Sequence, residues 1–90
     1  MTSANFPERI GPYVPERLIG RGAMAAVYLS RGTDGRPVAL KWLDQPIPAW
    51  MRRFEAEIRA IEKIKHPGVV KLLDHGDWEA RPYLVMEYID

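Results

Sequence analysis

A glycine-containing motif followed by a lysine-bearing apolar segment constrains this chain most. Residues 20–27 follow the pattern G-x-G-x-x-A-x-V, and Val38–Lys41 (VALK) follows about one β-hairpin later. Because glycine has no Cβ, its backbone N–H groups can approach an anion closely, and a lysine on a neighbouring strand adds a positive charge there. The two motifs therefore predict a loop and a strand that together bind phosphate groups.

Composition narrows the class of protein. Ninety residues with 47% hydrophobic and 28% charged residues are typical of one small globular domain. The absence of cysteine and the presence of only two histidines argue against disulfides and a metal site. A net charge of +1 argues against nucleic acid as a partner. No segment is apolar enough to span a membrane and residues 1–7 lack a signal pattern, so a cytoplasmic location is expected.

The spacing of apolar residues predicts an α+β fold. We expect a flexible tail at residues 1–12 and a single domain at residues 13–90. The expected elements are strands at 14–20, 26–31 and 36–43 with a turn at 32–35, a helix at 49–65 ended by His66-Pro67-Gly68, and strands at 69–74 and 81–88 joined through 75–78. They predict a five-stranded antiparallel sheet with one packed helix, in the order βββαββ.

One carboxylate in the expected helix needs a partner. At helical spacing, Glu57 falls within the apolar sector formed by Trp50, Phe54, Ile58, Ile61 and Ile64. An unpaired carboxylate there would cost several kcal/mol, so Glu57 should meet a cation or lie at the rim of a wet cleft.

Strand alternation offers that cation. Lys41 shares a face of its strand with the small residue Ala39 and with Leu43, whereas Val38, Leu40 and Trp42 face the other side. A Lys41–Glu57 pair would direct the ammonium group at phosphates, and Ala39 would leave room for a flat ligand. The alternative is that Lys41 extends to solvent and Glu57 lies at a solvated edge.

Together these motifs resemble the N-terminal lobe of protein kinases, most closely the bacterial eukaryotic-like (Hanks-type) Ser/Thr kinases. The resemblance covers residues 13–90 and includes the glycine motif, Val38–Lys41, Glu57, His66-Pro67 and Leu84–Tyr88 (LVMEY). It implies an ATP-dependent enzyme that transfers the γ-phosphoryl group of ATP to a hydroxyl of a protein substrate.

The resemblance also implies the roles of individual residues. Lys41 would hold the α- and β-phosphates and Glu57 would orient it, the two being the catalytic residues of this segment. The loop residues Gly20, Arg21, Gly22, Ala23, Met24 and Ala25 would cover the phosphates. The adenine would contact Ile19, Val27 and Ala39, with Met86 as gatekeeper and Glu87, Tyr88 and Ile89 as the hinge.

Two departures from the family pattern matter. Ala25 stands where the third glycine is usual, and Ala23 stands where the bacterial group often has glycine, so each methyl is expected to restrict the loop and lower nucleotide affinity. The H-R-D-x-x-x-x-N and D-F-G motifs do not occur in these 90 residues. The catalytic base and the Mg²⁺ ligands are therefore expected beyond Asp90, and these 90 residues alone should not turn over.

Two other functions compete with this interpretation. A catalytically inactive, pseudokinase-like interaction module would carry the same motifs, and an exposed apolar face would favour self-association. A dinucleotide-binding βαβ unit also fits G-x-G-x-x-A, with Asp44 near the position of a ribose-binding acid. Against the latter, Val14–Leu18 contains a proline and two charges, which is typical of an edge strand.

Overall fold

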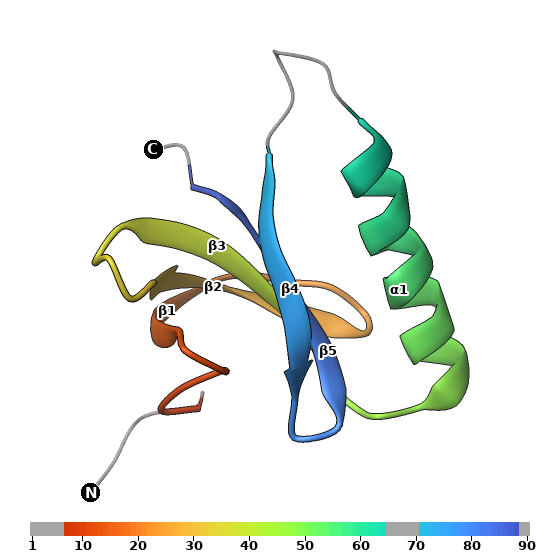
Figure 1. The fold of residues 1–90 in the computed structure, drawn as a ribbon. Helices are drawn as coiled ribbons and strands as arrows, with labels where there is room; N and C mark the ends of the chain where they lie inside the picture. Colours follow the sequence, from red (N-terminus) through yellow and green to blue (C-terminus); the bar gives the residue numbers. More distant parts are fainter. Residues whose placement is uncertain (1–6, 65–70, 89–90) are drawn as a thin grey trace, which may run out of the picture.

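The computed structural model describes residues 7–64 and 71–88. Its elements are β1 (Val14–Arg21), β2 (Ala25–Arg31), β3 (Pro37–Leu43), α1 (Pro48–Lys63), β4 (Leu72–Trp78) and β5 (Arg81–Glu87). The strands form one antiparallel sheet in the order β1-β2-β3-β5-β4, and α1 packs beside it (Figure 1). The predicted α+β fold with a βββαββ order is confirmed, and β1 is an edge strand as expected.

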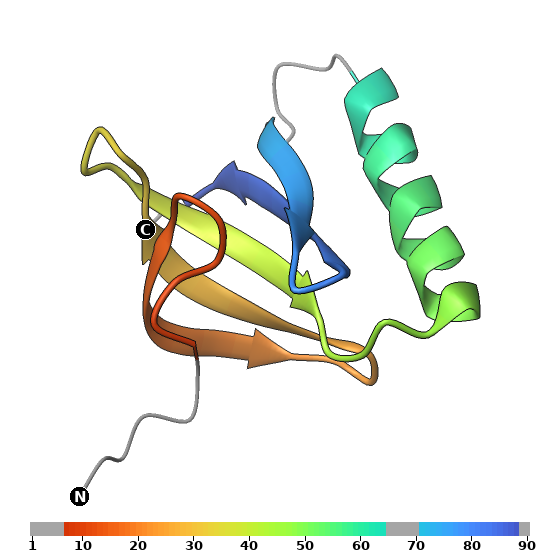
Figure 2. The same cartoon turned by 60° about the horizontal axis from the view of Figure 1, so that its bottom comes forward.

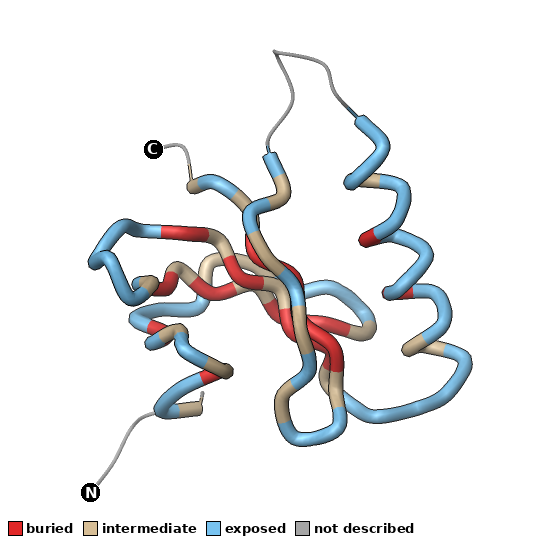
Figure 3. Tube along the Cα trace, in the orientation of Figure 1, coloured by how far each residue is buried: buried red, intermediate tan, exposed pale blue. Residues whose placement is uncertain are grey.

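The central strand β3 separates two apolar clusters. Val38, Leu40 and Trp42 belong to a cluster on one face of the sheet, and Leu43 belongs to a second cluster that includes Phe54 of α1. Figure 3 shows that the buried residues lie mainly along the strands, while much of α1 is exposed. Side chains on β3 therefore reach one cluster or the other according to the two-residue period of a strand.

Helix α1 begins and ends slightly earlier than predicted. Its first residue is Pro48, which suits a helix start because the first-turn N–H groups have no partner within the helix. The helix ends at Lys63, and Ile64 is already extended and 50% exposed, so it is not on the buried face. Phe54 and Ile58 are buried as expected. The predicted stop at 66–68 lies outside the described residues.

The β4–β5 hairpin differs from the prediction. Residues 75–78, expected as the connection, belong to β4, and the turn consists of Glu79 and Ala80 with φ of 53° and 64°. Gly76 is a strand residue opposite Tyr83, and a Cβ at Gly76 would lie 2.8 Å from the Tyr83 hydroxyl. This glycine therefore makes room for an aromatic ring rather than forming a turn. Residues 69 and 70 of the predicted strand lie outside the described residues.

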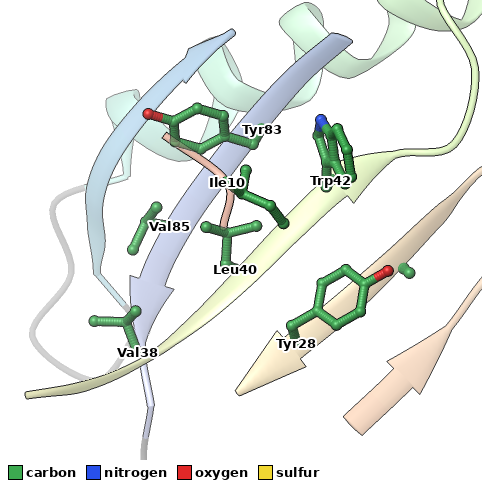
Figure 4. Close-up of a cluster of buried hydrophobic side chains, with 8 residues drawn as sticks. Ile10, Tyr28, Val38, Leu40, Trp42, Tyr83 and Val85 are labelled. Carbon is green, nitrogen blue, oxygen red and sulfur yellow. The ribbon is translucent and has the colours of Figure 1, made fainter. Parts of the chain in front are cut away.

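The described residues before β1 contribute to the core, in contrast to the predicted tail at residues 1–12, of which residues 1–6 lie outside the described residues. Ile10 is fully buried beside Leu40, Trp42 and Tyr83 (Figure 4). Its backbone exchanges two hydrogen bonds of 2.9 and 3.0 Å with Tyr13. The Tyr13 hydroxyl in turn donates to a carboxylate oxygen of Asp74, at 2.7 Å. These contacts attach the segment to the sheet.

We expect Ile10→Ala to destabilise the fold markedly. Loss of a fully buried Ile side chain costs about 2–5 kcal/mol, because apolar contacts are lost and a cavity remains. Urea unfolding followed by tryptophan fluorescence would measure the change. Leu73→Ala removes as many carbon atoms at a 52% exposed position and is the matched control. Equal effects of the two substitutions would contradict the placement of Ile10 in the core.

Tyr13 should give the fold a dependence on alkaline pH. Burial raises the pKa of Tyr13, and the hydrogen bond to Asp74 raises this pKa further. The folded state therefore holds the phenolic proton after the unfolded state has lost it, so stability is full below about pH 10 and falls as the pH rises above that value. Tyr13→Phe should flatten this fall in urea unfolding between pH 9 and 11. An unchanged slope would contradict the assignment.

Candidate functional site

An ion pair between the sheet and the helix forms the centre of the candidate site. Lys41 Nζ of β3 lies 3.0 Å from Oε1 and 3.3 Å from Oε2 of Glu57 on α1. The side chains are 29% and 45% exposed, so the pair is reachable from solvent. The contact predicted from strand alternation and helix periodicity is present in the structure, and the Glu57 carboxylate meets this cation at a solvent-exposed position.

A cavity of about 420 Å³ lies next to this pair. Its walls come from the β1–β2 connection, β3 and α1, and its lining residues are Gly22, Ala23, Met24, Ala25, Lys41, Leu43, Trp50, Arg53, Phe54, Ala56 and Glu57. The cavity thus brings four predicted loop residues together with the predicted lysine and glutamate. Sequence reasoning missed Arg53 as a lining residue, although its position one helical turn before Glu57 places both on one helix face.

The loop over this cavity is a tight hairpin between β1 and β2. The Gly22 N–H donates to the Ala25 carbonyl at 2.9 Å, and the hairpin tip approaches the connection between β3 and α1 (Figure 2). A Cβ built on Gly20 or Gly22 would meet no atom beyond its chain neighbours closer than 3.8 Å. The hairpin itself therefore does not require glycine there, and the free space suits the close approach of a ligand to the backbone.

An apolar surface continues from Lys41 along the same face of the sheet. The strand register pairs Val27 with Lys41, and Ala39 with both Leu29 and Met86. Directly paired residues in an antiparallel sheet lie on the same face. Val27, Ala39 and Met86 are each partly buried, as is Ile19 of β1. The predicted adenine-contacting residues of the three strands β2, β3 and β5 thus lie on the lysine side, and Leu29 joins them although sequence reasoning omitted it.

The remaining predicted residues do not line the cavity beside Lys41. The guanidinium group of Arg21 donates a hydrogen bond of 2.9 Å to the carboxylate of Asp44. The N–H of Glu87 donates to the carbonyl of Lys71, and the carboxylate of Glu87 accepts from the N–H of Lys71, both at 3.1 Å. Glu87 and Tyr88 line a separate hollow of about 540 Å³. Ile89 lies outside the described residues.

The fold excludes the dinucleotide-binding alternative. That unit needs parallel strands joined by a helix, whereas residues 25–31 form strand β2 and the strand pairs within residues 7–64 and 71–88 are all antiparallel. Asp44, considered for ribose binding, bonds Arg21 instead.

The described residues contain neither a metal-binding cluster nor a membrane-spanning helix. Residues 7–64 and 71–88 contain no group of three or more His, Cys, Asp or Glu side chains placed to hold a metal ion. Within the same ranges, no helix has the length and apolar character needed to cross a membrane.

Comparison with known proteins agrees with this geometry. The family model described as "Protein kinase domain" matches residues 13–90. The serine/threonine-protein kinase Pkn1 of Myxococcus xanthus is 40% identical over 91% of this chain, and a probable serine/threonine-protein kinase of Streptomyces coelicolor is 38% identical over 93%. The chain spans only 12% and 14% of the lengths of these two relatives.

A solved structure shares the arrangement of strands and helix. The kinase domain of Mycobacterium tuberculosis PknI superposes with a TM-score of 0.69 and 28% identity, over 90% of this chain and 34% of that one. A double mutant of the same domain superposes over the whole of this chain with a TM-score of 0.73 and 27% identity. The chain therefore belongs to the protein kinase domain family, and it corresponds to the amino-terminal lobe of that domain in bacterial Ser/Thr kinases.

Proposed function

We propose that this chain is the ATP-binding part of a Ser/Thr protein kinase that transfers the γ-phosphoryl group of ATP to a protein hydroxyl. The observation that carries the proposal is the Lys41–Glu57 ion pair, which faces a cavity beneath the glycine-containing hairpin. The Ser/Thr class is supported by the two bacterial relatives. The partners of this enzyme are ATP and a protein substrate, and we place the reaction in the cytoplasm. Self-association of the chain stays a prediction.

The ion pair serves positioning more than folding. A pair as exposed as Lys41–Glu57 contributes at most about 1 kcal/mol to stability. Its effect on the geometry of the site matters more than its effect on stability. The lysine side chain has four rotatable bonds, and the contact with Glu57 selects one direction for the ammonium group of Lys41. The carboxylate fixes Nζ in the lining of the cavity, where it can neutralise the charge of the α- and β-phosphates.

The hairpin and the apolar surface suit the two ends of ATP. The backbone around Gly22 leaves open space for the close approach of phosphate oxygens. Val27, Ala39 and Met86 supply a partly buried apolar wall on the same side of the sheet for the adenine ring. A bound Mg²⁺ would neutralise phosphate charge during transfer, and its protein ligands are expected beyond Asp90.

Lys41→Met should abolish phosphoryl transfer in the full-length protein. Methionine keeps most of the length of the side chain but removes the charge at the phosphates, so we expect kcat/KM to fall by at least about 100-fold. Transfer of ³²P from ATP to a generic protein substrate would measure the loss. Lys63→Met, at an exposed position near the end of α1, is the matched control and should keep normal activity. Normal turnover by Lys41→Met would disprove the proposed role.

Glu57→Gln should weaken the enzyme without unfolding it. The amide can still accept a hydrogen bond from Lys41 but no longer holds the ammonium by charge, so kcat/KM should fall by about 3- to 30-fold. Thermal stability should change little because the pair is exposed. Steady-state kinetics together with thermal melting would separate the two effects. Glu55→Gln changes the same charge on an exposed position of α1, and an equal loss in that control would show a general effect of helix charge.

A further inference from the structure

A second ion pair ties the glycine-containing hairpin to the end of β3. Arg21, the residue between the two glycines, places Nη1 2.9 Å from Oδ2 of Asp44, which directly follows β3. The side chains are 52% and 28% exposed. The pair bridges residues that are 23 positions apart in the chain.

Both polar groups of the Asp44 backbone also form hydrogen bonds. Its N–H donates to the carbonyl of Met24 at the hairpin tip, at 2.8 Å. Its carbonyl accepts a hydrogen bond of 2.7 Å from Nη1 of Arg81. The Arg81 guanidinium carbon in turn lies 3.6 Å from the centroid of the Trp42 ring. Asp44 thus connects the last residue of β1 and the tip of the hairpin to the buried part of the sheet.

The Arg21–Asp44 pair lies on the side of the hairpin away from Lys41. The register pairs Arg21 with Ala26 and Ala26 with Trp42, so these residues share the face opposite to that of Val27 and Lys41. Tyr28 is buried on the same face, and its pKa is raised by burial and, to a smaller extent, by Asp44, while Arg21 lowers it. The pair therefore contacts the hairpin on the face opposite to Lys41 and leaves the Lys41 face free for the phosphate groups.

We propose that Asp44 is a positioning residue for ATP, which holds the glycine-containing hairpin over the phosphates through Arg21 and Met24. This inference rests on the proposed function, because it concerns the same nucleotide. The connecting residues 22–24 lie outside both strands, and Gly22 and Ala23 are exposed, so the tip can adopt positions of similar free energy. An ion pair that favours one position raises the fraction of molecules able to bind ATP and lowers the apparent dissociation constant by the same factor.

A double-mutant cycle on the full-length protein tests this role. We expect Arg21→Gln and Asp44→Asn each to raise the KM for ATP, and the dissociation constant of a fluorescent ATP analogue, by about 2- to 5-fold. The KM for the protein substrate should not change. The double variant should be no worse than either single variant, and the charge exchange Arg21→Asp with Asp44→Arg should restore part of the affinity. Arg21 is exposed, so its variant carries the test if Asp44→Asn does not fold.

The Arg31–Glu16 pair provides a matched control. It joins β1 to β2 at 3.1 Å with side chains 44% and 42% exposed, and it lies at the end of the hairpin away from the tip. Arg31→Gln with Glu16→Gln should leave the KM for ATP unchanged.

Three results would overturn the role of Asp44. They are an unchanged KM in the single variants, additive effects in the double variant, and an equal effect of the control pair. If Lys41→Met is inactive while these variants bind ATP normally, only the role of Asp44 fails. If Lys41→Met is fully active, the proposed function itself is disproved, whatever the result for Asp44.

Discussion

The two-residue period of β3 determines how each face of the sheet is used. Leu40 and Trp42 enter the cluster around Ile10, while Lys41 and Leu43 face α1 and the cavity. A shift of one residue in the register would place Lys41 in the apolar cluster and Leu40 beside Glu57. Because burial of an unpaired ammonium group costs much more than the ion pair contributes, the packing of the opposite face keeps Lys41 in position. The chemistry of one face thus depends on the hydrophobic packing of the other.

Those parts of the structure that follow from local periodicity could be predicted from the sequence. Strand alternation predicted which residues of β3 face which side, and the helical period predicted that Phe54 and Ile58 are buried. The Lys41–Glu57 contact could also be predicted, because a carboxylate within an apolar sector requires a cation and one lay on the facing strand. The boundaries of β1, β2 and β3 differ from the prediction by only one residue.

The features that could not be predicted depend on contacts between distant residues. The ring of Tyr83 lies so close to Gly11 and Gly76 that a Cβ on either would come within 2.8 Å of its hydroxyl. Local reasoning assigned both glycines to irregular segments, because glycine is usual in turns. The actual β4–β5 turn uses Glu79 and Ala80 in the left-handed region, which neither residue favours. Packing of the flanking strands supplies this conformation, so the short-range sequence contains no signal for it.

The alanine at the third position of the glycine motif has a structural role that sequence comparison alone would not indicate. Ala25 is 5% exposed and belongs to the same apolar cluster as Leu43 and Phe54. Phe54 precedes Glu57 by three positions on α1, so both lie on neighbouring parts of one helix face. The methyl group therefore packs toward the helix, and one cluster positions both the start of β2 and the helix that carries Glu57. Arg21 and Asp44 act on the hairpin from the opposite face, so the hairpin is held from both sides of the sheet.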